Sequence, residues 1–292
     1  MGADLRREWP RLRELLTRAE QLSGRDIAGP MFAGPQERLH DPVVTQLAMF
    51  TLSVSLAELL AAEGLRPTVV AGHSLGEYAA LVTAGWLDAD DALAAVAERA
   101  AAMADCCASH DGAMTAVIGL APDALEELCV GIEGVAVLAN RNSPKQSVVA
   151  GEPRSVHRLV RSALSGGARA AIPLPVSGAF HSPLMAAAEQ RLAPVIARLP
   201  LRIGDVPFVS SISGELVDDV EDYRRSLAGQ ITAPVRWDRV MTTLQSGGVD
   251  AFVEVGPGRA IRGLLRHVDR GIVSHGCDSL RACQELTGRR AA

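Results

Sequence analysis

A Gly-x-Ser-x-Gly pentapeptide at residues 72–76 constrains the fold more than any other feature of this sequence. It stands between the β-type run 67–70 and the helix formers of 77–84. In a strand–turn–helix context, this pattern forms a tight turn that lifts the serine hydroxyl clear of the backbone, beside the positive end of the following helix. The small residues let strand and helix approach closely, and the amide after the serine can donate to an oxyanion. We therefore predict that Ser74 is a nucleophile and that the Leu75 N–H helps to form an oxyanion hole.

The hydrophobic pattern divides the chain into a large α/β part and a smaller inserted part. The inserted part follows the order strand, helix, strand, strand, helix, strand, which is the pattern of a ferredoxin-like unit. Its predicted segments are 113–120, 122–130, 135–140, 146–151, 153–164 and 168–174. We expect a small subdomain at 110–175 and a large subdomain formed by 1–109 and 176–292. The large subdomain is predicted to contain helices 9–22, 42–60, 77–85, 88–107, 183–199, 237–246 and 259–267, with strands before the pentapeptide and at 207–211 and 251–255.

Composition excludes several classes of protein. The net charge of −5 argues against a nucleic-acid binder, which normally carries a strong basic excess. The most hydrophobic stretch, 43–65, is interrupted by Gln46 and Glu58, so we interpret it as a buried helix and not as a membrane span. No apolar signal region opens the sequence. The cysteines show no Cys-x-x-Cys pair and no metal spacing, which predicts reduced thiols in a cytosolic protein; they are Cys106, Cys107, Cys129, Cys277 and Cys283.

A serine nucleophile needs a general base, and the sequence offers seven histidines. His73 adjoins the serine but should point away across the turn, so we interpret it as a packing residue. His181 lies between "VSGAF" and "SP", in a loop at the exit from the small subdomain, where a cleft is expected. The other histidines lie in polar or helix-surface settings. His181 is therefore the predicted base.

Five segments in this order and spacing carry a resemblance to a known family: "AGHSLGEYAALVTAG", "GAMTAVIGL", "VSGAFHSPLM", "APVRW" and "EVGPGRAIRGLL". Together they resemble malonyl-CoA:acyl carrier protein transacylases and, equally, the acyltransferase domains of polyketide synthases. The resemblance covers nearly the whole chain. It implies an α/β fold in which a hydrolase-like, parallel-sheet large subdomain carries an inserted ferredoxin-like small subdomain, as the pattern above also predicts.

The resemblance also implies roles for single residues. Ser74 and His181 match a Ser-His dyad, in which a carbonyl orients the histidine in place of a carboxylate; the matching position is Gln230 in "GQITAPVRW". Arg99 matches an arginine that grips the free carboxylate of malonate, a role that suits a guanidinium with two parallel donors. Sequence without the resemblance favours a solvated arginine paired with Glu98 or Asp105. The family arginine is usually followed by glycine, whereas alanine follows Arg99 here.

Three further positions match residues that line the substrate pocket. Gln46 in "VTQLA" and Asn142 in "NRNSP" match polar positions. Phe180, just before the histidine, resembles the malonyl-selective version of the family and should narrow the pocket where a 2-methyl group would lie. One methyl group changes binding by only about 1–3 kcal/mol in such a pocket.

The resemblance departs from the family pattern at the N-terminus. Relatives open with a strand that ends in Gly-Gln-Gly-Ser-Gln, whose glutamine amide is the second oxyanion donor. The present sequence starts just beyond that segment, so we expect one sheet strand and half of the oxyanion hole to be missing. A start codon placed too far downstream and a real divergence with reduced activity both fit this departure. Losing one such donor lowers turnover roughly 10²–10³-fold.

The resemblance implies ping-pong transfer of a malonyl group from coenzyme A to the phosphopantetheine thiol of an acyl carrier protein, in the cytoplasm, with no metal or other cofactor and no nucleic acid or membrane partner. Three alternatives remain: a stand-alone polyketide acyltransferase with the same chemistry and a different carrier, a hydrolase that clears acyl groups from carriers, and a poorly active partner protein.

Because acyl carrier proteins are acidic, the surface that docks the carrier should be basic. The first candidate is one face of helix 153–164, which is either this docking surface or an ordinary solvated surface; it is formed by Arg154, His157, Arg158 and Arg161. The next candidate is the helix with Arg259, Arg262 and Arg266.

Overall fold

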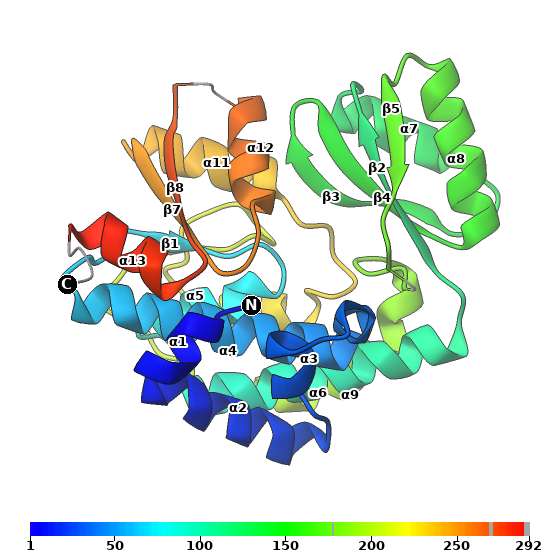
Figure 1. Cartoon of the computed structure of the whole chain (residues 1–292). Helices are drawn as coiled ribbons and strands as arrows, with labels where there is room; N and C mark the ends of the chain where they lie inside the picture. Colours follow the sequence, from blue (N-terminus) through cyan, green and yellow to red (C-terminus); the bar gives the residue numbers. More distant parts are fainter. Residues whose placement is uncertain (177, 269–270, 289–292) are drawn as a thin grey trace.

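The protein is an α/β structure in which a helical layer supports two sheet-containing parts (Figure 1). The computed structural model describes residues 1–176, 178–268 and 271–288. The predicted segment "VSGAFHSPLM" therefore includes one position, 177, that lies outside the described residues. The first elements are all helical: α1 (Ala3–Glu8), α2 (Pro10–Ser23), α3 (Ala28–Phe32), the 3-10 helix η1 (Gln36–His40) and α4 (Pro42–Ala62).

Helix α4 forms the centre of the helical layer. It begins where the Asp41 side chain accepts hydrogen bonds from the N–H groups of Val43 and Val44, and Pro42 occupies the first helical position. The apolar side chains of α4 are distributed around its whole circumference, which is typical of a buried helix. Its length and composition would allow it to cross a membrane. However, 72% of its most hydrophobic 18-residue stretch is buried inside the fold. It packs on α2 and on α6 (Ala89–Ser109), so the prediction of a buried core helix is confirmed.

A four-stranded antiparallel sheet forms the part on the right of Figure 1. Its elements are β2 (Ala113–Ile118), α7 (Pro122–Val130), β3 (Ala136–Ser143), β4 (Gln146–Gly151), α8 (Pro153–Ser165) and β5 (Ala170–Pro173), with strand order β3-β4-β2-β5. Helices α7 and α8 cover one face, where Val117, Leu125 and Leu159 are buried. The other face buries Met114 and Ala139 and packs toward the loop that carries Phe180. That loop is thereby held against the sheet.

The remaining strands form two parallel pairs. Strand β1 (Val70–Ala71) pairs with β6 (Phe208–Val209), and β7 (Ala251–Val255) pairs with β8 (Val273–Cys277). Among the described residues these pairs are separate and do not join into one continuous sheet. The helices around them are α5 (Gly76–Thr83), α9 (Ala186–Ala197), α10 (Val220–Ala228), α11 (Trp237–Ser246), α12 (Ala260–Val268) and α13 (Leu280–Thr287), with the 3-10 helix η2 (Pro183–Met185) before α9.

Two predictions about local structure are wrong. The strand expected at 207–211 shortens to β6, because only two of its residues pair with β1. The cysteines were all expected to be reduced, but Cys277 and Cys283 form a disulfide. The end of β8 and the first turn of α13 place their Cα atoms 5.5 Å apart, which is within the usual range for a bridged pair.

Candidate active site

The turn that carries Ser74 joins β1 to α5 and depends on Gly72. A Cβ atom at that position would lie 2.1 Å from the carbonyl carbon of Gly76, so only glycine allows the strand to approach the helix. Gly76 itself faces open space. The prediction that small residues let strand and helix approach closely is therefore confirmed for Gly72 and wrong for Gly76.

Ser74 and His181 share an unusual backbone conformation. Their φ angles are 53° and 58°, and they are the only non-glycine residues with positive φ in the described part of the chain. The left-handed region is unfavourable for residues with a Cβ atom, and such residues persist only where the surrounding structure fixes them. Strain of this kind is concentrated at functional sites.

The two side chains meet, although 107 positions separate them in the sequence. Ser74 Oγ lies 2.7 Å from His181 Nε2. On the other side of the ring, Nδ1 lies 3.0 Å from the backbone oxygen of Gln230 and 3.0 Å from that of Ala233. Carbonyl oxygens only accept, so Nδ1 carries the proton and Nε2 presents a lone pair to the serine.

The His181 ring is therefore neutral, with its Nε2 lone pair directed at Ser74 Oγ. Burial, the Arg99 guanidinium and then His73 lower its pKa to about 3, against a smaller opposing effect of the two carbonyls. A ring that stays neutral at physiological pH can accept a proton from a hydroxyl group. The sequence pointed to the carbonyl of Gln230 but not to that of Ala233, whose side chain gives no signal of a polar role.

Arg99 lies buried beside Ser74, and the residue as a whole is 2% exposed. Nη2 donates to Ser74 Oγ at 3.1 Å and Nη1 donates to Gln46 Oε1. Nε has no hydrogen-bond partner, and no described carboxylate forms an ion pair with this guanidinium. Burial lowers its pKa. A buried cation without an ion-pair partner is costly, because it has lost its hydration without gaining a direct anionic contact.

The alternative partners of Arg99 are engaged elsewhere. Glu98 and Asp105 pair with Arg191 of α9, at 3.1 Å and 2.6 Å. These three side chains are partly exposed, whereas Arg99 is buried. The interpretation of Arg99 as a solvated surface residue is therefore wrong.

The Leu75 amide lies at the start of α5, directly after Ser74. Its φ and ψ are −49° and −35°, so the chain is already helical there. No hydrogen bond joins the Leu75 N–H to any residue that the structure describes. A free amide at the positive end of a helix can stabilise an oxyanion.

Asn142 and Phe180, the other two predicted pocket residues, lie between the small sheet and the neighbourhood of the serine turn. Asn142 is buried, and its Oδ1 lies 3.0 Å from His73 Nε2, so its side chain ties β3 to the turn. His73 also packs against the Trp237 ring, with centroids 5.4 Å apart, in keeping with the packing role predicted for it. Phe180 is half-buried and packs against both the helical core and the sheet core.

Sequence reasoning missed Glu77, a fully buried residue in the first turn of α5. Its carboxylate accepts hydrogen bonds from Ser210 Oγ at 2.9 Å, from the Ser211 N–H at 2.6 Å, and from Gln230 Nε2. Burial raises its pKa to about 7, and these hydrogen bonds oppose the rise. The signal was a single acid within an otherwise apolar first turn.

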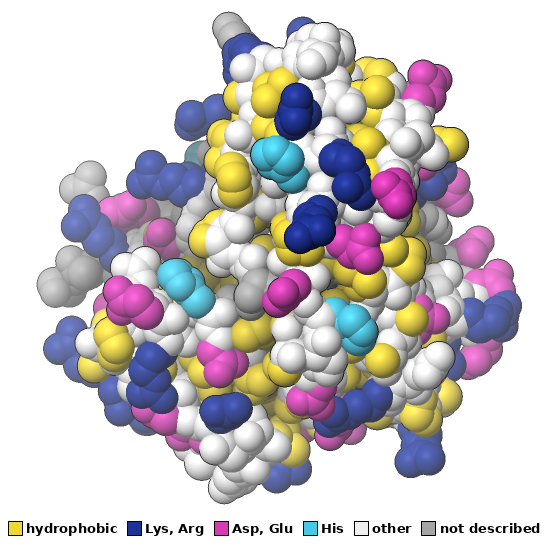
Figure 2. All heavy atoms as spheres, turned by 90° about the vertical axis from the view of Figure 1, so that its right-hand side faces the viewer, with side chains coloured by type: hydrophobic (Ala, Val, Ile, Leu, Met, Phe, Trp, Pro, Cys, Tyr) yellow, Lys and Arg dark blue, Asp and Glu magenta, His cyan; other side chains and the backbone are white. Residues whose placement is uncertain are grey.

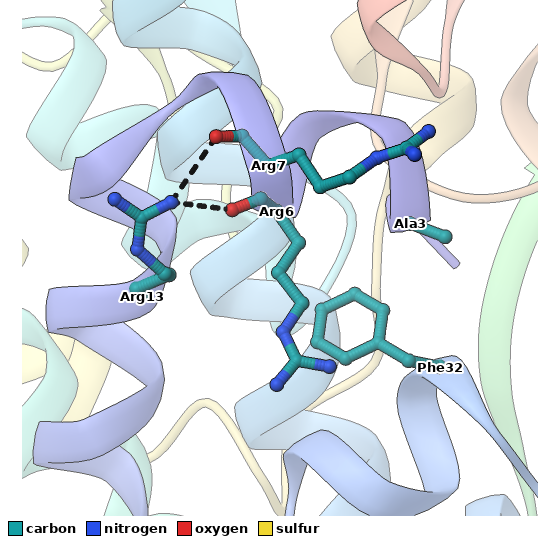
Figure 3. A pocket seen from close by; sticks show the side chains of 5 residues that line it. All are labelled: Ala3, Arg6, Arg7, Arg13 and Phe32. Atoms are coloured by element: carbon teal, nitrogen blue, oxygen red, sulfur yellow. Dashed lines mark hydrogen bonds between the residues drawn. The ribbon is translucent and has the colours of Figure 1, made fainter.

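A separate hollow of about 530 Å³ lies on the far side of the helical layer and holds no catalytic groups (Figure 3). Arg13 donates to the backbone oxygens of Arg6 and Arg7, at 2.7 Å and 3.2 Å, and so caps the end of α1. The Arg6 guanidinium lies over the Phe32 ring, 4.8 Å from its centroid. Figure 3 shows the Arg7 side chain pointing away from the other two guanidinium groups. The Arg6 and Arg13 side chains therefore hold α1 against its neighbours.

The chain is similar to known acyl transferases over most of its length. The family described as "Acyl transferase domain" matches residues 1–267. The malonyl CoA-acyl carrier protein transacylase of Bacillus subtilis (strain 168) is 36% identical over 273 residues, which are 92% of this chain and 86% of that protein. A crystal structure of MCAT from Streptococcus pneumoniae is 33% identical, with a TM-score of 0.90 over 99% of this chain and 95% of that one. A type II PKS acyl-carrier protein in complex with its malonyl-transacylase is 30% identical, with a TM-score of 0.92 over 99% and 94% of the two chains.

Proposed function

Because the chain belongs to the acyl transferase domain family, we propose that it transfers a malonyl group from coenzyme A to the phosphopantetheine thiol of an acyl carrier protein, through a malonyl-serine intermediate on Ser74. It is an enzyme, a malonyl-CoA:acyl carrier protein S-acyltransferase, and it acts in fatty acid or polyketide synthesis. The names of its relatives support both the substrate and the partner.

One observation carries the choice of a carboxylated acyl group. The Arg99 guanidinium is buried, lacks a carboxylate partner among the described residues, and lies 3.1 Å from the nucleophilic oxygen. A malonyl group attached to Ser74 has a free carboxylate three carbons from the ester oxygen, at the reach of this guanidinium. Two parallel charge-assisted hydrogen bonds would then replace the water that the carboxylate loses on entering the site.

In the first half-reaction, His181 Nε2 takes the proton of the Ser74 hydroxyl as the oxygen attacks the thioester carbonyl. The Leu75 N–H donates to the oxyanion that forms. The carbon–sulfur bond breaks, and the coenzyme A sulfur leaves with the proton from His181. The malonyl ester of Ser74 remains.

In the second half-reaction, the phosphopantetheine thiol gives its proton to His181 and attacks the ester. The same oxyanion forms and collapses, and Ser74 leaves with the proton. The carbonyls of Gln230 and Ala233 hold the ring in one tautomer through both halves. The transfer uses groups of this chain and the two thiols, with coenzyme A thioester as a substrate and no further cofactor.

We place the reaction in the cytoplasm, where carrier and coenzyme A thioester meet, and we propose α8 as the docking helix. Figure 2 faces the side of the molecule that carries α8 and shows basic side chains and a histidine gathered in the upper part of the view. The exposed residues on this helix are Arg154, His157, Arg158 and Arg161, which we call the α8 basic face. An acidic carrier fits such a face, because complementary charge accelerates encounter.

We propose that the two parallel strand pairs and their helices form a hydrolase-like large subdomain (1–109 and 176–292), and that 110–175 form a ferredoxin-like small subdomain. The strand order β3-β4-β2-β5, with α7 and α8 on one face, supports the second assignment.

Trapping the acyl-enzyme tests the function. The protein is incubated with radiolabelled malonyl-CoA, quenched and digested, and label is sought on Ser74; the Ser74→Ala variant is the control. A chase with carrier protein should move the label to the carrier thiol much faster than water removes it. Release to water alone, unaffected by carrier, would identify a hydrolase. No label on Ser74 would refute the mechanism.

A further inference from the structure

Glu77 is a fully buried carboxylate that the transfer steps above do not use. It projects from the first turn of α5, three positions after the nucleophile. Its three partners, Ser210 Oγ, the Ser211 N–H and Gln230 Nε2, are all donors, which suits an ionised carboxylate. An isolated carboxylate is costly to bury, and the three donors offset part of that cost here.

Gln230 connects this carboxylate to both members of the dyad. Its Nε2 donates to Glu77 and also to the backbone oxygen of Ser74, at 3.1 Å. Its own backbone oxygen accepts from His181 Nδ1 at 3.0 Å. The amide side chain thus fixes the turn that carries the nucleophile, and the main chain of the same residue fixes the base.

We propose that Glu77 is a positioning residue for the Ser74–His181 pair: its carboxylate anchors the Gln230 side chain, and through Gln230 it holds the serine turn and the carbonyl that orients the histidine. A triad would place a carboxylate directly on the histidine; here the carboxylate acts one residue away. The inference rests on the proposed function only in taking Ser74 and His181 as the reacting pair.

The substrate clamp lies outside this network. Arg99 and Gln46 hydrogen-bond to each other and to Ser74 Oγ or Met103, and to none of the groups that Glu77 holds. Loss of the Glu77 carboxylate should therefore misalign the dyad without removing a contact to the malonyl carboxylate. A general loss of structure would instead affect both.

The experiment compares the full-length wild type with Glu77→Gln, Gln230→Ala and the double variant. The first readout is the rate at which a fluorophosphonate probe labels Ser74, measured by mass spectrometry, since this reaction needs the dyad but no malonyl-CoA. The second readout is kcat and KM for malonyl transfer. We expect each single variant to label and turn over at least tenfold more slowly, with KM for malonyl-CoA within twofold. The double variant should be no slower than the slower single variant, because both changes break one connection.

Leu81→Ala is the matched stability control, since Leu81 is fully buried in the same helix and has no polar side-chain atom. It should lower Tm and keep the labelling rate within twofold. If Glu77→Gln does not fold, Gln230→Ala carries the test, because it keeps the backbone carbonyl and leaves Glu77 in place. Labelling at the wild-type rate in the folded variants, or slowing that only matches that of Leu81→Ala at equal Tm, would overturn the inference. A wild type that labels at Ser74 but transfers no malonyl group would refute the proposed function alone, and a wild type that does not label would contradict the dyad and this inference with it.

Discussion

The guanidinium of Arg99 donates to the hydroxyl oxygen of Ser74, at 3.1 Å, from a position that is almost completely buried. The Ser74 hydroxyl therefore contacts a buried cation that has no ion-pair partner among the described residues. The cation lowers the pKa of His181, and it offers a charged partner to an acyl group that has a carboxylate of its own.

We predict that Arg99→Ala lowers kcat/KM for malonyl-CoA roughly 10–100-fold, since a hydrogen bond to a charged group contributes about 1.5–3 kcal/mol. Acetyl-CoA has no such carboxylate, so its transfer should change little and the preference should shift toward acetyl. Both rates are measured with one carrier protein. Arg191→Ala, which removes an exposed arginine, is the control; equal losses for the two thioesters in Arg99→Ala would contradict the clamp.

The pH dependence of kcat/KM should reveal a neutral histidine. Because the pKa of His181 is lowered to about 3, its basic form persists far below the ordinary value of 6.5, and the rate should not fall between pH 7 and pH 5 through this group. In Arg99→Ala, assayed with acetyl-CoA, the acid limb should move to higher pH, because the cation no longer disfavours protonation. An acid limb centred near pH 6.5 in both the wild type and Glu77→Gln, whose residue 77 cannot titrate, would show that the ring is not held as described.

Glu77 should make stability depend on pH. Its pKa in the folded protein is about 7, above the ordinary value of 4.5. A raised folded-state pKa means that its contribution to stability is fully present below about pH 4.5 and is lost as pH rises through 7. The difference in Tm between wild type and Glu77→Gln, which cannot titrate, should therefore fall by several degrees between pH 5 and pH 8, for a change of up to about 3 kcal/mol. A difference that stays constant across that range would contradict the raised pKa.

Charge reversal on the α8 basic face tests the docking proposal. Arg154 and Arg161 form no hydrogen bond or ion pair with other described residues, so Glu can replace them with little structural cost. The double variant should raise KM for carrier protein several-fold at low salt, with the effect fading as salt rises and KM for malonyl-CoA unchanged. Arg18→Glu with Arg25→Glu makes the same change in net charge on the exposed surface near α2. An equal rise in that control, or none in either variant, would move the docking face elsewhere, with α12 as the next candidate.

Phe180 should determine the size of the acyl group. Phe180→Ser opens space beside His181 and is expected to raise the ratio of methylmalonyl to malonyl transfer roughly tenfold, in line with about 1–3 kcal/mol for one methyl group. The ratio is measured by competition between the two thioesters for one carrier. An unchanged ratio would show that the ring does not border the 2-position.

Local features followed from the sequence because they depend on residues that are close along the chain. The start of α4 follows from Asp41 and Pro42, and the serine turn follows from the need for glycine at position 72. The order of strands and helices between 113 and 173 agrees with the alternation of apolar positions. Motif spacing singled out Ser74 and His181, but no local pattern places their side chains 2.7 Å apart.

Only the tertiary structure decided which side chains form hydrogen bonds, ion pairs or a disulfide with one another, because the two members of each pair come from segments that packing brings together. Glu98 and Asp105 lie near Arg99 in the sequence, yet the turn of α6 directs them to Arg191 and leaves Arg99 with Gln46 of α4. The bridge between Cys277 and Cys283 depends on how β8 is followed by α13. In the same way, the Glu77 carboxylate gains its hydrogen-bond donors only through packing. The end of β6 and the loop after α10 bring these donors to it from more than 130 positions away. The sequence by itself determined the elements and the types of reacting residues, and the packing of distant elements decided which charges are buried and what each of them holds.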